Sequence, residues 1–329
     1  MYSEQCADQS PRGGLPVYEV EGFWSSLLPM TAAMENPLLD FGHMLIYYNK
    51  RALSFQSDAL RALAGITRRV SQKAKCRFLQ GMPTAAFDVF LLFESNMSGA
   101  LRRRQGFPSY SWVGWKGSLT VSMRSRMFNI LNQWLEFYTW IIWYKRSPSG
   151  VLNPVWDPAA NELFPLGDMS YPGYRKRRPF RGPPGVSINS TRTSPTQALD
   201  GDPIPKSEYP LLQFWTVSAH FRVQLEVASA ASGKARIVTA QGTLAGHIWL
   251  DGMEETDMFS TQDTFEFILL SRTMRRDTLD TQDPKAGYYV LLLEWKGRIA
   301  ERRGLGLLDM SALANCLPPG PQWKEIILG

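Results

Sequence analysis

The sequence predicts an α+β fold, in which an N-terminal helical segment is followed by a mostly antiparallel, β-rich body. Apolar residues recur at helical spacing between residues 37 and 94, whereas apolar and polar residues alternate strictly along Trp215–Val227. The later strands are joined by short connections without crossover helices, which favours antiparallel pairing. Hydrophobic residues make up 44% of the 329 residues, so the chain can bury a sizeable core.

Residues 1–36 carry little periodic signal, and we expect an irregular N-terminal segment that prolines and glycines interrupt. The segment has no apolar stretch of the kind that a secretory signal requires. The three cysteines, Cys6, Cys76 and Cys316, are odd in number and far apart. This spacing is neither a disulfide framework nor a zinc site, and it favours a reducing compartment.

Residues 37–117 form the predicted helical region. We expect helices over Pro37–Lys50, Ser57–Val70 and Thr84–Glu94. In the second of these, Ser57 is a natural N-cap, and apolar or small residues follow at i, i+3, i+4 and i+7. Thr84 has the same capping role in the third.

Residues 118–329 form the predicted antiparallel β-rich region. Seven apolar residues alternate with six polar ones along Trp215–Val227, which predicts a half-buried strand. Phe137–Tyr144 is apolar on both faces, as expected of a central strand, and a turn then leads to a second strand at Val151–Trp156. Pro154 places that second strand at an edge of the sheet, or itself at an end of the strand. Further strands are expected at Thr243–Leu250, Thr264–Leu270, Tyr288–Trp295, Arg298–Leu308 and Trp323–Leu328.

The net charge of +6 comes mainly from one short basic run, Arg175–Arg181. Without its five cations, 31 basic residues would face 30 acidic ones. The run lies in a Pro-, Gly-, Ser- and Thr-rich stretch at about 170–206, which we interpret as a flexible, solvated basic loop. The alternative is a nuclear-localisation or nucleic-acid patch, but Phe180 is its only aromatic residue. A second cluster, Arg102–Arg104, has the same two interpretations, and solvation is again preferred.

The most apolar stretch, Met127–Tyr144, is too short and too interrupted to cross a membrane. Its uninterrupted part, Phe137–Tyr144, is far shorter than the about 20 residues of a spanning helix. We therefore expect a soluble, cytoplasmic protein without membrane association; nuclear localisation through residues 175–181 is the alternative.

Few motifs in the chain carry chemistry. The phosphate-binding G-x-x-x-x-G-K-[ST] pattern, a G-x-G-x-x-G after a strand, H-E-x-x-H and G-x-S-x-G are all absent. The three histidines are His43, His220 and His247. His220 lies on the polar face of the strongest predicted strand and His247 in another strand; both are interpreted as ordinary surface histidines rather than as a base or a ligand.

Two acidic groups and two serines are candidate sites. Both acidic groups lie in predicted loops. The first consists of Asp251, Glu254, Glu255 and Asp257, and the second of Asp277, Asp280 and Asp283. A hard cation needs such oxygens to converge, but neither group has the spacing of an EF-hand. Ser109 and Ser111 have no base nearby in the sequence and are interpreted as turn or packing residues. The sequence thus predicts no catalytic, cofactor-binding or metal-ligating residue and no cofactor.

The most specific string is Phe107–Gly117, with the sequence FPSYSWVGWKG. It resembles the F-P-S-W-S-W-A-G-W segment of fungal heterokaryon-incompatibility (HET) domain proteins, with Tyr110 in place of a usual Trp. Ser57–Ile66 is similar to a stretch upstream of that segment. Downstream, the similar stretches are Tyr209–Val223, Phe265–Arg272, Glu294–Leu308 and Trp323–Ile326, so the resemblance runs in order from about residue 45 to the C-terminus.

The family's defining HET domain, which is similar to a TIR fold, lies upstream of the segment that begins here near residue 45. Its W-x-R-x-W-T-x-Q-E-like motif is absent from residues 1–44, so no catalytic residue carries over. The resemblance implies the C-terminal region of such a protein without its HET core, with a role in non-self recognition and programmed cell death. Any TIR-like cleavage of a nicotinamide nucleotide would belong to the missing domain.

The first hypothesis is therefore a non-catalytic interaction region with a protein partner, no nucleic-acid partner and no membrane partner. The alternatives are an uncharacterised enzyme on the β-rich scaffold, with a loop site at Asp251–Asp257, and a nucleic-acid-binding module that uses Arg175–Arg181. The aromatic signature residues Phe107, Trp112 and Trp115 are interpreted first as core and second as an interaction surface.

Overall fold

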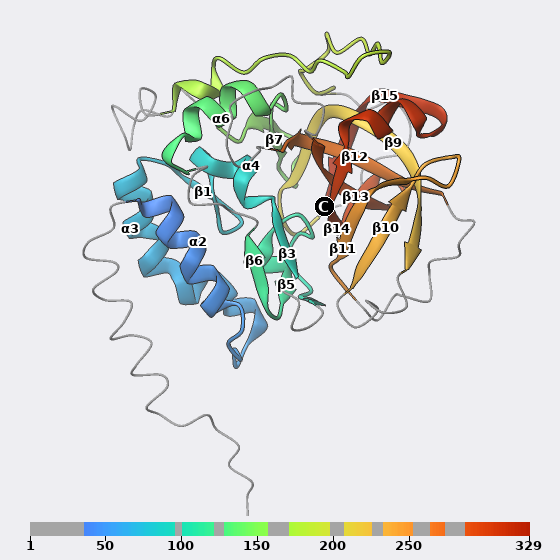
Figure 1. The fold of residues 1–329 in the computed structure, drawn as a ribbon. Helices are drawn as coiled ribbons and strands as arrows, with labels where there is room; N and C mark the ends of the chain where they lie inside the picture. Colours follow the sequence, from blue (N-terminus) through green and yellow to red (C-terminus); the bar gives the residue numbers. More distant parts are fainter. Residues whose placement is uncertain are drawn as a thin grey trace, which may run out of the picture. The chain divides into compact units, whose positions relative to one another are not determined.

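A computed structural model describes residues 36–95, 101–121, 128–156, 171–197, 207–225, 233–252, 264–273 and 287–329. The chain divides into two units, Met1–Glu35 and Asn36–Gly329, and every described residue belongs to the second. In that unit, helices come first and a nine-stranded sheet follows (Figure 1). The predicted α+β fold is confirmed. The predicted irregular segment lies, apart from Asn36, outside the described residues.

The first two predicted helices are present, but the second begins later than expected. Helix α2 (Pro37–Tyr48) is capped by Asn36, whose side chain accepts a hydrogen bond from the amide of Leu39 at 3.2 Å. Two 3₁₀ turns, η1 (Gln56–Ala59) and η2 (Arg61–Leu63), precede helix α3 (Ala64–Ala74). Ser57 therefore lies inside η1 and is not an N-cap. The apolar spacing resembled one helix because 3₁₀ turns nearly preserve helical periodicity.

The third predicted helix is much shorter than expected. It consists of η3 (Thr84–Ala86) and α4 (Phe87–Phe90), and the chain then extends into β3 (Phe93–Ser95). The Thr84 hydroxyl bonds the backbone of Arg77 instead of capping the helix. The other short elements of this region are β1 (Phe78–Leu79), β2 (Met82–Pro83), β4 (Arg102–Arg103), η4 (Trp112–Gly114), β5 (Trp115–Lys116) and β6 (Leu119–Val121). They pair as β1–β2, β3–β6 and β4–β5.

Six antiparallel strands form a closed ring. They are β9 (Leu211–Leu225), β10 (Lys234–Val238), β11 (Leu244–Leu250), β12 (Thr264–Arg272), β13 (Gly287–Lys296) and β14 (Ile299–Asp309). The hydrogen-bonded order is β10–β11–β14–β13–β12–β9, and β10 also pairs with β9, which closes the ring. The predicted strands are confirmed, β10 is additional, and the end of the predicted Trp215–Val227 strand lies outside the described residues.

The last strand, β15 (Leu317–Leu328), follows the 3₁₀ segment η8 (Met310–Asn315). It runs antiparallel to the first half of β9 and meets β14 at one parallel bridge, between Ala300 and Leu328. The hairpin of β7 (Tyr144–Arg146) and β8 (Leu152–Pro154) pairs with the start of β9. Strand β8 is at the edge of the sheet, as Pro154 predicted.

The prediction of a central strand over Phe137–Tyr144 is wrong. The segment begins inside helix α6 (Leu131–Tyr138), and regular strand structure starts only at Tyr144. Leu131, Trp134, Leu135 and Tyr138 are buried at helical spacing, a pattern that begins before the apolar run. The run looked like a strand because its sequence is apolar on both faces, and a short apolar run does not distinguish a strand from a buried helix end.

Residues 171–197 contain one regular element, η5 (Pro172–Tyr174), and otherwise run irregularly along the sheet. Their side chains and carbonyls nevertheless make specific contacts. Phe180 is buried against Trp140 and Tyr288, and the indole of Trp323 donates to the carbonyl of Arg192 at 2.6 Å. This segment therefore packs against strands β13 and β15.

Candidate functional site

The signature Phe107–Gly117 forms a tightly packed turn at the junction between the helical segment and the strand ring. The Trp112 indole donates to the carbonyl of Gly81 at 2.9 Å, and the Trp115 indole donates to that of Ser109 at 2.8 Å. Both indoles are buried, whereas Phe107 is half-buried. The interpretation of the two tryptophans as core is confirmed.

The close approach of another backbone segment explains why the signature has a glycine at position 114. A Cβ atom there would lie 2.2 Å from the carbonyl oxygen of Pro108, which is far inside van der Waals contact. The Gly114 carbonyl accepts from the amide of Arg104 at 2.7 Å and from the Arg103 guanidinium at 2.9 Å. Any side chain at Gly114 would push this close crossing of two backbones apart.

Arg302 is the centre of the junction and is fully buried with its partner Asp251. Its guanidinium donates to both carboxylate oxygens of Asp251, at 2.7 and 3.1 Å, and to the carbonyl of Leu91 at 2.8 Å. It also donates to the carbonyl of Phe93, whose ring centroid lies 3.5 Å from the guanidinium carbon. Strand β14 is thereby joined to the α4–β3 segment by charge-assisted hydrogen bonds.

Ser109 joins the signature to the end of the chain. Its hydroxyl donates to the carbonyl of Gly329 and accepts from the amide of Arg302 at 2.8 Å, and its own amide donates to the same Gly329 carbonyl at 2.9 Å. Ser111 caps η4 and donates to the carbonyl of Gln80 at 2.6 Å. The prediction that both serines are turn and packing residues agrees with these bonds.

Of the two acidic groups that were candidate metal sites, the structure describes only Asp251. Asp251 is buried against Arg302, while Glu254, Glu255, Asp257, Asp277, Asp280 and Asp283 lie outside the described residues. Burial raises the pKa of the Asp251 carboxyl, and the charge and hydrogen bonds of Arg302 oppose that rise. Among the described residues, no group of three or more His, Cys, Asp or Glu side chains is arranged to hold a metal ion.

The basic run is less solvated than predicted. The Arg177 side chain is 6% exposed, forms an ion pair with buried Asp88 and stacks on Tyr174 with 4.4 Å between guanidinium carbon and ring centroid. Arg178 lies over the ring of Phe137 at 4.1 Å. The interpretation of a solvated loop is therefore wrong for Arg177, because Asp88 would otherwise be a buried carboxylate without a cation.

The Arg102–Arg104 cluster also departs from the solvated interpretation. Arg102 is exposed, but Arg104 is buried and donates to the carbonyl of Val113 at 2.6 Å and to the Gln56 side chain at 2.9 Å. Arg103 donates to the carbonyl of Phe107 at 2.8 Å. These arginines hold the signature turn by binding its backbone carbonyls, which a basic side chain can do without an acidic partner.

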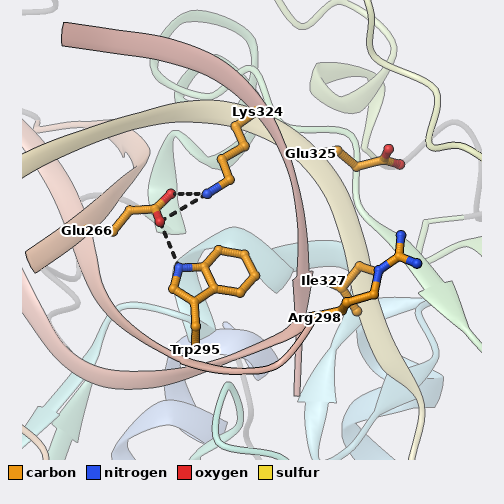
Figure 2. A pocket seen from close by; sticks show the side chains of 6 residues that line it. All are labelled: Glu266, Trp295, Arg298, Lys324, Glu325 and Ile327. Carbon is orange, nitrogen blue, oxygen red and sulfur yellow. Dashed lines mark hydrogen bonds and ion pairs between the residues drawn. The ribbon is translucent and has the colours of Figure 1, made fainter. Parts of the chain in front are cut away.

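An open pocket of about 420 Å³ lies on the same strand ring, beside β15. It is lined by Glu266 of β12, Trp295 of β13, Arg298 of the β13–β14 turn, and Lys324, Glu325 and Ile327 of β15. Figure 2 shows Glu266, Lys324 and Trp295 turned toward one another, with Arg298, Glu325 and Ile327 on the opposite side. A pocket of this size falls in the range of small-molecule sites.

Glu266 organises one wall of this pocket. Its side chain is 8% exposed and accepts from both the Lys324 ammonium, at 2.7 and 3.0 Å, and the Trp295 indole at 2.7 Å. The Ser218 hydroxyl is a further donor. Burial alone would raise the pKa of Glu266, but these hydrogen bonds outweigh it and lower that pKa below its usual value.

Glu325 is held from the opposite side of β15. One of its oxygens accepts from the Thr196 amide at 2.7 Å and from the Gln213 side chain at 2.8 Å, and the other accepts from the Thr196 hydroxyl at 2.9 Å. The irregular segment 171–197 therefore contributes to the support of the pocket. Both carboxylates of the site are fixed by the chain itself.

The three histidines take no common position. His43 is exposed on α2, and His247 is half-buried on β11. His220 has 28% of its side chain exposed, with 4.0 Å between its Nε2 and a Glu266 oxygen. It thus lies next to the pocket carboxylate without lining the pocket.

Of the residues in the two charged centres, sequence reasoning singled out Asp251 alone, as a member of an acidic group and not as the partner of an arginine. Arg302 and five of the six pocket residues lie in stretches that carried the family resemblance, but no residue pattern singled them out. Glu266 and Lys324 are isolated polar positions on separate strands, and they pair because β12 and β15 lie on the two sides of β9. A charged residue within an otherwise apolar strand was the one signal available for Glu266.

In the described part of the chain, no helix has the length and hydrophobicity needed to span a membrane. Comparison of the sequence and the fold with known proteins found no matching family model, no matching curated protein and no matching solved structure. The resemblance to the HET family therefore stays a prediction, and the site must be interpreted from its own chemistry.

Proposed function

We propose that this chain is the non-catalytic C-terminal region of a HET-type heterokaryon-incompatibility protein. It would act in the cytoplasm, in fungal non-self recognition and programmed cell death, by binding a protein partner. The catalytic step of such a protein would reside in a HET core outside the described residues.

One observation carries this proposal: stretches that resemble the family at separate places in the sequence converge in the fold. The signature Phe107–Gly117 and the stretch Glu294–Leu308 meet where Ser109 bonds the amide of Arg302. Three such stretches, Phe265–Arg272, Glu294–Leu308 and Trp323–Ile326, supply five of the six pocket residues. A chance resemblance over scattered strings has no reason to gather at one junction and one pocket.

The non-catalytic part of the proposal rests on how candidate nucleophiles and acids are used. Ser109, Ser111 and Asp251 are each buried and bonded to backbone or to an arginine. Such groups serve the packing of the junction, since a reacting group must reach its substrate.

A fusion experiment tests the proposal. The chain is joined in frame behind a fungal HET core and expressed from an inducible promoter in a filamentous fungus, alongside the core alone. We expect the rate of cell death to depend on the attached chain and to change with Arg302→Met, but not with the neighbouring Arg303→Met. Equal death with and without the chain would contradict the regulatory role.

A second measurement tests the absence of catalysis directly. The purified chain is incubated with NAD, and the nucleotide is followed over time. We expect no turnover, and hydrolysis at a rate comparable to that of TIR-type enzymes would overturn the non-catalytic assignment.

A further inference from the structure

Residues 192–197 contact strands β9 and β15 mainly through their own main-chain carbonyls. Two indoles and one side-chain amide of the sheet donate to the carbonyls of three alternate residues: Trp323 to Arg192 at 2.6 Å, Trp215 to Ser194 at 3.2 Å and Gln213 to Thr196 at 3.0 Å. Alternate carbonyls point to the same side of an extended chain. The segment therefore lies on the sheet as an extended peptide, held by side chains instead of by a strand ladder.

Thr196 makes the most specific contact of the segment. Its amide and its hydroxyl donate to the two oxygens of Glu325, at 2.7 and 2.9 Å, and Arg146 donates to its carbonyl at 3.1 Å. An apolar side chain in this position would take one donor away from the carboxylate, and hydrogen bonds to charged groups are among the stronger ones. The sheet therefore selects a hydroxyl at this position.

Five side chains hold the segment, and together they form what we call the carbonyl-binding face: Arg146, Gln213, Trp215, Trp323 and Glu325. Strand register places Trp215 opposite Glu325 and Gln213 opposite Tyr144. Residues two positions apart in a strand point to the same side. The five side chains therefore share one face of β7, β9 and β15.

The carbonyl-binding face is ordered by hydrogen bonds of its own. Arg146 Nε donates to the side-chain oxygen of Gln213 at 2.6 Å, and the Gln213 nitrogen donates to Glu325 at 2.8 Å. Neither bond involves residues 192–197. Preorganised groups of this kind lose little conformational entropy when a peptide binds.

The segment itself is suited to exchange with another peptide. None of residues 191–197 is buried, so the segment contributes no side chain to the core. Pro195 restricts Ser194, the residue before it, to extended conformations. Extended peptides that contain proline bind aromatic-lined surfaces with little loss of entropy. A second peptide with a hydroxyl in the position of Thr196 can make the same contacts.

We propose that the carbonyl-binding face is a recognition site for an extended peptide of a partner protein, with a proline followed by Ser or Thr. Residues 192–197 occupy this site in the free chain as an autoinhibitory contact, which the partner peptide displaces. This inference rests on the protein-binding role proposed above and names the chemistry of the partner. The tethered segment competes at an effective concentration in the millimolar range.

A peptide with the sequence of residues 190–197 tests the site. It is titrated, at up to about 1 mM, into the ¹⁵N-labelled full chain and into a vacated chain, the full chain with alternating Gly and Ser at positions 192–197. The indole signals of Trp215 and Trp323 are identified by their loss in Trp215→Phe and Trp323→Phe. We expect the peptide to shift both signals in the vacated chain, and to bind the parent chain at least about tenfold more weakly because the parent's own segment competes.

Matched peptides test the hydroxyl contact. Thr196→Val removes the hydroxyl that donates to Glu325, and should reduce the affinity of the peptide for the vacated chain about tenfold. Thr193→Val is the control, because none of the contacts above involves that side chain; it should leave the affinity within about twofold. The substitution Thr196→Val in the full chain should have the opposite effect and raise the affinity for the unaltered peptide, because the tethered segment then competes less.

Three results would overturn the proposal. They are no peptide binding by a folded vacated chain, equal binding by the parent and vacated chains, and equal affinities of the Thr196→Val and Thr193→Val peptides. If the vacated chain does not fold, the full chain with Thr196→Val replaces it, and no gain in peptide affinity over the parent overturns the proposal. The peptide assay uses the purified chain alone, so its failure is distinguishable from equal cell death with and without the chain, which contradicts the proposed function.

Discussion

Two carboxylate–cation pairs on the same strand ring differ in their surroundings. Asp251 and Arg302 are both fully buried, and their remaining hydrogen bonds end on backbone carbonyls of the α4–β3 segment. Glu266 is 8% exposed and Lys324 is 38% exposed, and their pair faces an open pocket. The first pair therefore joins two parts of the fold, whereas the second lines a pocket that is open to solvent.

The comparison shows that two carboxylate–cation pairs of similar chemistry can have different roles because they differ in burial. A buried pair must satisfy every donor and acceptor inside the chain, because a vacant one is costly in a low-dielectric interior. A partly exposed pair can keep a donor for an outside group at little cost, since water satisfies it in the unbound state.

The largest expected effect is at Arg302. The variant Arg302→Met leaves the Asp251 carboxylate buried without its cation, and we expect a loss of about 3–5 kcal/mol in the free energy of unfolding, measured by urea denaturation. Arg303→Met is the control, because Arg303 pairs with partly exposed Glu294 and should cost less than about 1 kcal/mol. Equal losses in the two variants would mean that the buried Asp251–Arg302 pair contributes no more to stability than the partly exposed Glu294–Arg303 pair.

A pH effect is expected at Glu94, a residue of β3 close to the buried pair. Burial raises the pKa of Glu94 from 4.5 to about 7; Arg302 opposes this and Asp251 adds to it. The folded state therefore binds the proton more tightly than the unfolded state. The contribution of Glu94 to stability is present below pH 4.5 and is lost as the pH rises to about 7, a change of about 3 kcal/mol at most.

Glu94→Gln tests this contribution, because an amide does not titrate. Unfolding free energies of both proteins are measured between pH 5 and 8, and the variant is expected to gain stability relative to the parent as the pH rises. Parallel pH profiles would show that burial does not raise the pKa of Glu94 in the folded chain.

A smaller effect is expected at Ser109. Ser109→Ala removes the acceptor of the buried Arg302 amide and one donor to Gly329, so we expect a loss of about 1–3 kcal/mol in unfolding free energy. Ser149→Ala provides a control at an exposed serine bonded to Ser147 and should be nearly neutral. A neutral Ser109→Ala would mean that the junction does not depend on this hydroxyl.

The smallest effect on stability is expected in the pocket. Glu266→Gln weakens the bonds to Lys324 and Trp295, and because Lys324 is partly exposed the loss should be about 1 kcal/mol at pH 7. The pKa of Glu266 is lowered in the folded state, so its contribution is present above its usual value and is lost as the pH falls through the folded value. The gap between variant and parent should therefore close in acid; a constant gap would exclude the ion pair as its cause.

Residue patterns predicted the strands better than the helices. In the second half of β9, the side chains on one face are buried and those on the other face are partly exposed. The alternation of apolar and polar residues that results is visible in the sequence. The assignment of Phe137–Tyr144 as a strand is wrong because an almost wholly apolar run has no period that separates a helix end from a strand. The second predicted helix begins later than expected for a related reason. Apolar residues three or four positions apart fit a 3₁₀ turn nearly as well as an α-helix, so the turns before α3 looked like its first residues.

The sequence alone determined the fold class, the order of helices before strands, the edge position of Pro154 and the use of Trp112 and Trp115 as core. These properties depend on neighbouring residues, and a local period or a missing amide is sufficient to predict them. Only the tertiary structure decided that the basic residues Arg104, Arg177 and Arg302 are structural, and that Glu266, Lys324 and Trp295 meet at a pocket. Those contacts join residues up to 211 positions apart, and burial, which sets the role of each charge, exists only once the chain is folded.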